Sequence, residues 1–239
     1  MEPPSGTALT VVMVCLTVAT GVLDAVSFLA LGHVFTATQT GNLLFLGFGI
    51  AGQGGLPVVL TVVSLGSFAL GAVLGARMEA TLADRQQHWF PAALLAEAGL
   101  LAAAAVTGWE AGPAWGPALA RRCTVIGLMA VAMGVRNVTA IRVGAPDLTT
   151  TVATRAMTAL FSGSPLGHDR RLGHGTHAVP RRLASVASMF LGALLGAWLI
   201  GLGTRPHLVL LLVAVLVAAT ALLVPGLTHR QDGPPRTSQ

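Results

Sequence analysis

Six long apolar runs constrain this chain more than any other feature of its sequence. They are Ala8–Leu31, Pro57–Met78, Phe90–Gly108, Cys123–Ile141, Leu183–Leu202 and His207–Val224. A helix of about 20 apolar residues crosses the hydrocarbon core of a bilayer, and lipid offers no water to bond an open backbone. The sequence therefore predicts an all-α integral membrane protein with six transmembrane helices.

Composition indicates one membrane domain over residues 1–239, ending in a flexible tail at residues 225–239. Charged residues make up 10% of the chain and hydrophobic residues 54%, whereas a soluble domain is about 25% charged. The two cysteines, Cys15 and Cys123, lie in apolar runs, so we expect no disulfide framework. All 14 basic residues are arginine. This bias is typical of GC-rich bacterial genomes, so we expect a bacterial plasma membrane protein.

Two further runs, Thr38–Gly52 and Thr149–Ser162, are too short and too polar to span. The apolar part of the first is only Leu43–Ala51. Runs of this length are more often re-entrant or interfacial than spanning, so we expect two half-helices. If both runs crossed the membrane, the protein would have eight helices, and this alternative stays open at this point.

The arginines favour six crossings with both termini in the cytoplasm. With six crossings, nine arginines lie on one side and three on the other. The nine are Arg77, Arg85, Arg142, Arg170, Arg171, Arg181, Arg182, Arg230 and Arg236, and the three are Arg121, Arg122 and Arg205. Eight crossings would give a split of eight to four. The positive-inside rule favours the more uneven split.

The two halves of the chain share a pattern. Residues 64–78, SLGSFALGAVLGARM, and 185–199, SVASMFLGALLGAWL, are identical at eight of 15 positions. A short threonine-rich run precedes each copy, and a span with ionisable or amide groups precedes that run. We therefore expect two repeats, at about 8–108 and 118–224. Three true spans per repeat make the repeats inverted, as in many transporters, whereas eight helices would make them parallel.

The repeated span carries a stripe of small residues four positions apart. The stripe residues are Ser67, Gly71 and Gly75 in the first copy and Ser188, Gly192 and Gly196 in the second. Such a stripe lets helix backbones approach closely in a membrane. We expect these two helices to pack at the centre of the bundle, against each other. The aliphatic last span is expected to face lipid, and a homo-oligomer is an open alternative.

The stretch TATQTGNLLFL, residues 36–46, has the chemistry of a helix start. Thr38 or Thr40 can cap the helix, Gly41 permits a tight approach, and Asn42 offers a donor and an acceptor. We expect a half-helix whose N-terminus points into the membrane interior, where its free N–H groups favour an anion. In the alternative, the threonines bond back to helix carbonyls and the glycine only packs.

Ionisable residues within the apolar runs complete the candidate site. Asp24 is about 10 Å deep and Arg136 roughly 7–8 Å deep, at 1.5 Å per residue, and Glu97 is in the middle of its run. Because isolated charges there are costly, we expect Asp24 to face a protein-lined cavity. Asn42 and Arg155 are expected to meet near the midplane. The candidate solute-binding residues are Asp24, Thr40, Gly41, Asn42, Arg136, Asn137, Thr154 and Arg155.

The segment GVLDAVSFLALGHVFTATQTGNLLFLG, followed by a GxRN segment and a threonine-rich segment, resembles the YoaK-like bacterial membrane proteins, domain of unknown function 1275. The resemblance runs from about Gly21 to Ala197. It implies a multi-spanning membrane protein and supplies no activity. A glutamine is usual in the family where Arg136 stands, and a Thr-Gly pair where Thr154–Arg155 stands. These departures imply a more positively charged site in this chain.

The sequence favours a transporter over an enzyme. It has no HExxH, no GxSxG, no P-loop and no paired carboxylates in one span, so we expect no catalysis and no cofactor. The histidines of GHDRRLGHGTHAVPRR lack the spacing of metal ligands, and we expect no metal. The charge lies in loops, so we expect no nucleic acid. The leading hypothesis is a permease in the lipid bilayer for a small polar or anionic solute. The alternative is a scaffold or sensor that binds another membrane protein.

Overall fold

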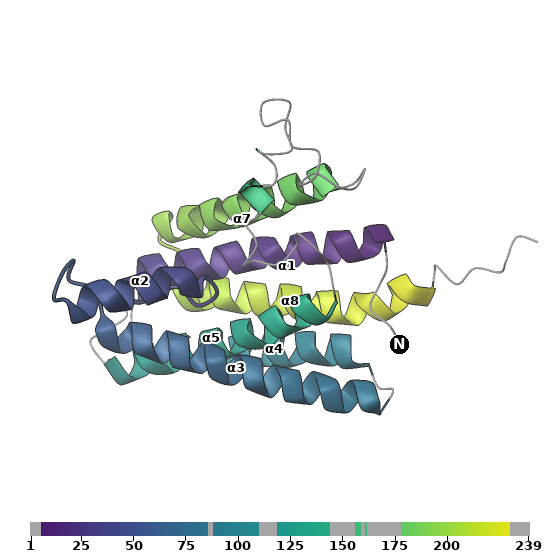
Figure 1. Cartoon of the computed structure of the whole chain (residues 1–239), viewed down its shortest axis with the longest axis horizontal. Helices are drawn as coiled ribbons and strands as arrows, with labels where there is room; N and C mark the ends of the chain where they lie inside the picture. Colours follow the sequence, from purple (N-terminus) through teal and green to yellow (C-terminus); the bar gives the residue numbers. More distant parts are fainter. Residues whose placement is uncertain are drawn as a thin grey trace, which may run out of the picture.

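Helices make up the ordered elements of this protein (Figure 1). The computed structural model describes residues 6–85, 88–109, 119–143, 156–158, 161 and 178–229. The elements are α1 (Gly6–Val26), η1 (Ser27–Gly32), α2 (Gln39–Ile50), α3 (Val58–Asp84), α4 (Trp89–Trp109), α5 (Leu119–Arg142), α7 (Ala178–Gly201) and α8 (Pro206–His229). Within these ranges there is no strand. The protein is therefore an all-α membrane protein, as predicted.

Six of these helices are long and apolar enough to cross a bilayer. They are α1 continued by η1, then α3, α4, α5, α7 and α8, and they lie along a common direction in Figure 1. Helix α2 has 12 residues and is too short to span. Because six crossings are an even number, the chain returns to the end of the bundle at which it starts, so Gly6 and His229 lie at the same end. We call this end of the bundle the N-terminal end. Of the second short run, the structure describes only residues 156–158 and 161.

The small-residue stripe of α3 lies against α5. A Cβ atom on Gly71 would lie 2.2 Å from the carbonyl oxygen of Val131. One on Gly134 would lie 2.3 Å from the carbonyl oxygen of Phe68. No real Cβ atom tolerates such distances, so both positions require glycine if the backbones are to stay this close.

The stripe of α7 makes the same kind of contact with α1. A Cβ atom on Gly192 would lie 2.1 Å from the carbonyl oxygen of Val18, and one on Gly21 would lie 2.5 Å from that of Met189. Each stripe therefore packs on the first span of the other half of the chain. The expectation that α3 and α7 pack against each other was wrong, because each stripe needs a facing glycine, and Gly134 and Gly21 supply it.

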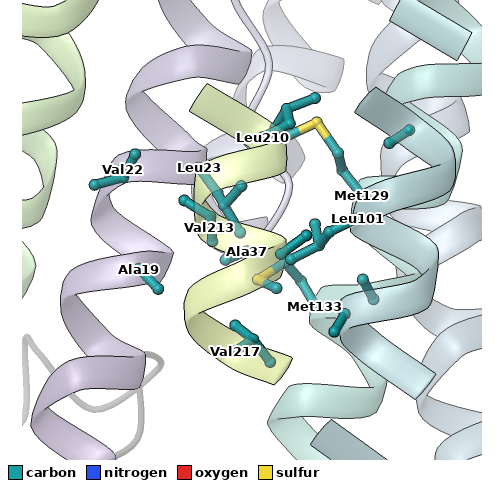
Figure 2. Packing of buried hydrophobic residues seen from close by; sticks show 14 of the residues in the cluster. Ala19, Val22, Leu23, Ala37, Leu101, Met129, Met133, Leu210, Val213 and Val217 are labelled. Carbon is teal, nitrogen blue, oxygen red and sulfur yellow. The ribbon is translucent and has the colours of Figure 1, made fainter. Parts of the chain in front are cut away.

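The positions of α3 and α7 also differ from the prediction, and that of α8 differs in part. Of the residues in the spanning part of each helix, 28% are buried in α3 and 22% in α7, against 61% in both α1 and α5. Helices α3 and α7 therefore lie at the edge of the bundle. Helix α8 is 39% buried and packs along α4. In Figure 2, Leu210, Val213 and Val217 of α8 lie among core residues such as Leu101 and Met133. One side of the last span is therefore part of the core, whereas its other side, with Leu212 and Val215, is exposed, as expected of a lipid-facing helix.

Two smaller expectations concern the chain end and the cysteines. Helix α8 continues to His229, so residues 225–229 are helical rather than part of a flexible tail. Residues 230–239 lie outside the described part of the chain. Cys15 and Cys123 are both free thiols, as the prediction of no disulfide framework requires.

We predict that Gly192→Ala destabilises the protein by about 1–3 kcal/mol, because the added methyl group meets backbone rather than a movable side chain. Gly66→Ala, on the open face of α3, is the matched control, since no atom lies within 4 Å of its Cβ position. Alanine there should be neutral or stabilising by about 0.4–1 kcal/mol. Reversible unfolding in detergent micelles measures both. Equal stabilities would contradict the close backbone contact.

Candidate functional site

The chain turns back into the bundle between η1 and α2. His33 has a left-handed conformation with φ 56°, which ends η1. Helix α2 then begins at Gln39, one residue before the predicted Thr40–Gly41–Asn42 start. Asn42 in its first turn is 0% exposed, whereas Ile50 at its end is 72% exposed. The prediction of a short, non-spanning helix at this place is confirmed. The position of its N-terminus within the membrane stays a prediction.

Asp24 holds this turn in place. Its Oδ1 atom accepts hydrogen bonds from the backbone N–H groups of Thr36 and Ala37, both at 2.9 Å. Its Oδ2 atom accepts hydrogen bonds from the Thr38 N–H at 3.0 Å and from the Thr38 hydroxyl at 2.6 Å. Asp24 thus faces protein rather than lipid, as expected. Its carboxylate binds the three backbone N–H groups that precede α2. A solute anion at the N-terminus of α2 stays a prediction.

Asn42 closes the same turn instead of facing a solute. Its Oδ1 atom accepts the Phe35 N–H at 2.9 Å, and its Nδ2 atom donates to the Phe35 carbonyl at 2.6 Å. The Nδ2 atom also donates to Ser64 of α3 at 3.1 Å and to Gln39 at 2.8 Å. A Cβ atom on Gly41 would lie 2.8 Å from the Phe35 ring, which explains the glycine. The polar residues of this turn therefore satisfy its non-helical backbone, as lipid requires.

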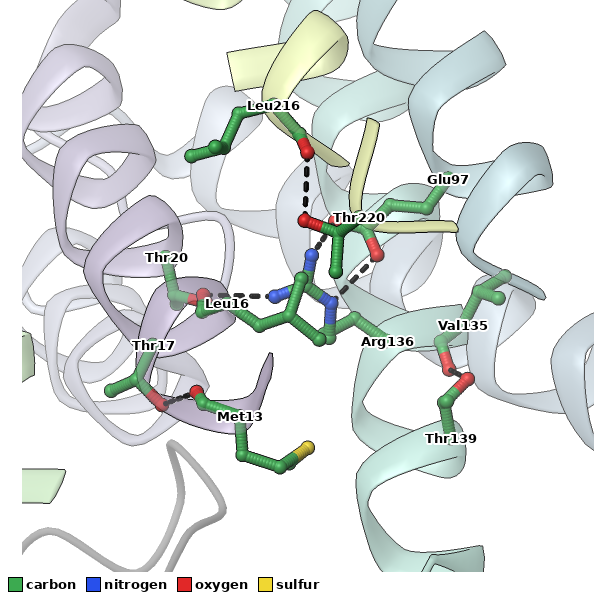
Figure 3. Close-up of polar contacts among 10 residues, drawn as sticks. All are labelled: Met13, Leu16, Thr17, Thr20, Glu97, Val135, Arg136, Thr139, Leu216 and Thr220. Atoms are coloured by element: carbon green, nitrogen blue, oxygen red, sulfur yellow. Dashed lines mark hydrogen bonds and ion pairs between the residues drawn. The ribbon is translucent and has the colours of Figure 1, made fainter. Parts of the chain in front are cut away.

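Arg136 and Glu97 form a buried ion pair (Figure 3). Arg136 of α5 binds both carboxylate oxygens of Glu97 of α4, through Nε at 2.6 Å and through a second contact from Nη2. Its remaining nitrogen, Nη1, donates to the carbonyl of Leu16 of α1 at 2.9 Å. Arg136 is 4% exposed and Glu97 0%. The pair therefore joins three spans in the interior of the protein.

The carbonyl of Leu16 has a second partner in this region. The Thr20 hydroxyl donates to it at 2.9 Å, one turn along α1. Thr17 similarly bonds back to Met13 at 2.8 Å. The guanidinium is thus oriented from two sides, by a carboxylate on α4 and by a carbonyl on α1.

A second acidic group, Glu79, is buried at the N-terminal end of the bundle. Glu79 is 0% exposed. Its carboxylate accepts one hydrogen bond from the Thr139 hydroxyl and another from Nε of Arg142 at 3.0 Å. Arg142 also lies over the Trp89 ring, 5.6 Å from its centroid. The sequence does not predict this cluster, because Glu79 is the first residue after the apolar run Pro57–Met78 and lies two positions from Arg77, as a solvated helix end would.

The structure divides the predicted site residues among separate places. Asp24, Gly41 and Asn42 form the turn before α2, and Thr40 is exposed. Arg136 pairs with Glu97 rather than with Asp24. Asn137 is on the same helix as Arg136, and Thr154 and Arg155 lie outside the described residues. Glu97, the sole ionisable residue of its apolar run, was noted as an intramembrane charge but was not among the predicted solute-binding residues.

We predict that Asp24→Asn loosens the turn before α2 without unfolding the six spans. An amide keeps one acceptor oxygen, so part of the bonding to residues 36–38 is lost. Hydrogen–deuterium exchange of those amides should rise about tenfold, since one such bond contributes about 1 kcal/mol or more. Thr17→Val is the control, because its buried hydroxyl bonds only within α1. Unchanged exchange in Asp24→Asn would mean that the carboxylate does not hold the turn.

Comparisons with known proteins identify a family of membrane proteins. The family described as "Protein of unknown function (DUF1275)" matches residues 12–223. The chain is 28% identical over 153 residues to the UPF0700 transmembrane protein YoaK of Bacillus subtilis (strain 168). That match covers 62% of this chain and 63% of the relative, which is less than two thirds of its length. No solved structure matches the chain. Because the family match extends over most of its length, this chain belongs to the DUF1275 family.

Proposed function

We propose that this protein is a small permease that moves a small polar or anionic solute across the bacterial plasma membrane. The observation that supports this most is the buried pair of Arg136 and Glu97. It joins α4 and α5, one helix from each half of the chain, and bonds to α1. Transporter sites typically lie between the two halves of such a chain.

The energetics of the pair favour a functional role over a structural one. Moving two charges out of water costs several kcal/mol each, and their attraction often fails to offset this cost. Apolar residues of similar volume are commonly as stable or more stable at such sites. Ionisable groups inside a membrane usually mark the path of a solute or an ion. A pair that adds little stability is best explained by what it binds.

Matching close contacts support an inverted repeat. Gly71 approaches Val131 of α5, and Gly192 approaches Val18 of α1. Gly134 approaches Phe68, and Gly21 approaches Met189. The matching residues of α3 and α7 are 121 positions apart (192 − 71, 189 − 68), and those of α1 and α5 are 113 apart (131 − 18, 134 − 21). Since α1 and α5 cross in opposite directions, these matches are the expected result of an inverted duplication.

A flux assay tests the permease. Purified protein in liposomes is exposed to gradients of small polar solutes and of potassium salts with valinomycin, and vesicle volume is followed by light scattering. At least one solute should cross faster than in protein-free liposomes. The double variant Arg136→Met with Glu97→Leu removes both charges together, so it should fold with about the wild-type stability. It should nevertheless lose the flux. Full flux in this variant would contradict the role of the pair.

Both termini are proposed to be cytoplasmic. Among the residues that the structure describes, five arginines lie in or beside the helix ends at the N-terminal end of the bundle, and three lie at the opposite end. They are Arg77, Arg85, Arg142, Arg181 and Arg182, and Arg121, Arg122 and Arg205 respectively. The positive-inside rule makes the first end cytoplasmic.

Cysteine labelling in intact cells tests this orientation. In a variant without Cys15 and Cys123, Gln53→Cys should react with an impermeant thiol reagent, because it lies in the loop between α2 and α3 at the opposite end. His88→Cys, at the start of α4, should react only after the cells are opened. Labelling of both positions from outside would show that α3 does not cross.

A second candidate is a scaffold or sensor that binds another membrane protein. It is supported by an apolar hollow on the outer face of α7, lined by Leu191, Leu194, Leu195 and Trp198. All four side chains are at least 41% exposed. A scaffold would show no solute flux in the liposome assay, and its function would survive loss of the Arg136–Glu97 pair.

A further inference from the structure

The buried ion pair also suggests which solute the protein moves, an inference that rests on the proposed permease. We propose that Arg136 binds a small planar monoanion in the place of the Glu97 carboxylate, and that one proton on Glu97 accompanies it. The protein would then move one monoanion and one proton together.

The shape of the solute follows from the contacts of Arg136. Its Nε and Nη2 groups donate side by side to the two oxygens of Glu97. This fork fits a planar anion with two oxygens in one plane, such as a carboxylate, bicarbonate or nitrate. The contact of Nη1 with the Leu16 carbonyl fixes the plane of the fork when Glu97 is displaced. Glu97 thus shows the geometry that an exchanging anion needs.

The need for a proton on Glu97 follows from the charge balance of the site. Arg136 and Glu97 are neutral together, so an added anion would leave one uncompensated negative charge in a buried place. Such a charge is costly inside a membrane. A proton taken from the water on the open side and held on a Glu97 oxygen restores neutrality. The proton and the anion then leave to the water on the other side, and no bond in the solute changes.

Ionisable groups on the neighbouring helices do not replace Glu97 in this role. Asp24 of α1 is bound to the turn at residues 36–38, and Glu79 of α3 is bound to Thr139 and Arg142. The other ionisable residues of the packed helices are Cys15 on α1, Arg77 and Asp84 on α3, Arg121, Arg122 and Cys123 on α5, and His207 and His229 on α8. Helix α4 has no ionisable residue besides Glu97.

The charge of the site selects a monoanion. Among the described residues, Arg136 is the one cation that contacts Glu97. A divalent anion would leave one negative charge unbalanced even with Glu97 protonated. Sulfate is therefore expected to be excluded, both by its charge and by its tetrahedral shape.

Nitrate is a suitable probe, because its acid is too strong to cross a bilayer in neutral form. Liposomes containing the full-length protein and the pH dye pyranine are given external nitrate, with equal potassium on both sides and valinomycin to hold the voltage at zero. Nitrate should enter and acidify the interior, and sulfate should do neither. Because binding takes up one proton, nitrate affinity should rise about tenfold for each pH unit of acidification while Glu97 is mainly ionised.

Two variants separate the anion from the proton. Glu97→Gln mimics the protonated residue, so it should still exchange nitrate for nitrate, without acidification and without pH dependence. Arg136→Lys keeps the charge but loses the fork, and its nitrate affinity should fall about 10- to 100-fold. Arg142→Gln is the matched control. It removes another paired arginine, at the end of the bundle, and should leave nitrate uptake unchanged.

The outcomes distinguish this inference from the permease itself. Nitrate entry without acidification, equal uptake of sulfate, or proton uptake by Glu97→Gln would each overturn the coupled monoanion site. In these cases the protein would still be a permease. Flux of a neutral solute but not of nitrate would also overturn the coupled monoanion site and leave the permease standing. Thermal stabilisation by nitrate that grows at low pH, with no flux of any solute, would support the site and overturn the permease.

Discussion

The close approach of α1 to α7 and of α3 to α5 is the contact on which the rest of this bundle depends. Apolar side chains gain little by leaving lipid for one another, so membrane helices associate through backbone proximity and packing. Glycines on both helices of each pair allow that proximity, with Gly21 facing Gly192 and Gly134 facing Gly71. The two pairs leave α4 and α8 to pack on each other and complete the core.

Within this frame, the three buried acidic side chains of the described residues, Asp24, Glu97 and Glu79, lie at different depths. Asp24 and its turn lie toward the end opposite the N-terminus, the Arg136–Glu97 pair lies between the ends, and Glu79 lies near the N-terminal end. Asp24 and Glu79 have evident structural roles, since they hold a non-helical turn and tie α3 to α5 respectively. The Arg136–Glu97 pair closes no turn, which is why the proposed transport site is placed there.

The proposed permease differs from a simple pore because an anion can enter its neutral site only together with a proton. An ion pair that is neutral and enclosed admits an anion only if another charge changes at the same time. The carboxylate of Glu97 can make that change by taking a proton, whereas the guanidinium of Arg136 stays charged under all ordinary conditions. The same two residues would therefore bind the solute and couple it to protons.

The sequence by itself determined the membrane class, the six spans and the short, non-spanning helix at α2, because these depend on local hydrophobicity and on the length of each run. The sequence also showed that Asp24, Arg136 and Glu97 lie within apolar runs, where an ionised side chain is costly to bury. Only the tertiary structure decided their partners: Asp24 binds its own turn, and Arg136 binds Glu97, 39 positions away in the chain. It also decided that each glycine stripe meets the first span of the other half. Partner choice depends on which helices lie side by side, and apolar runs of similar composition carry no local signal of that arrangement.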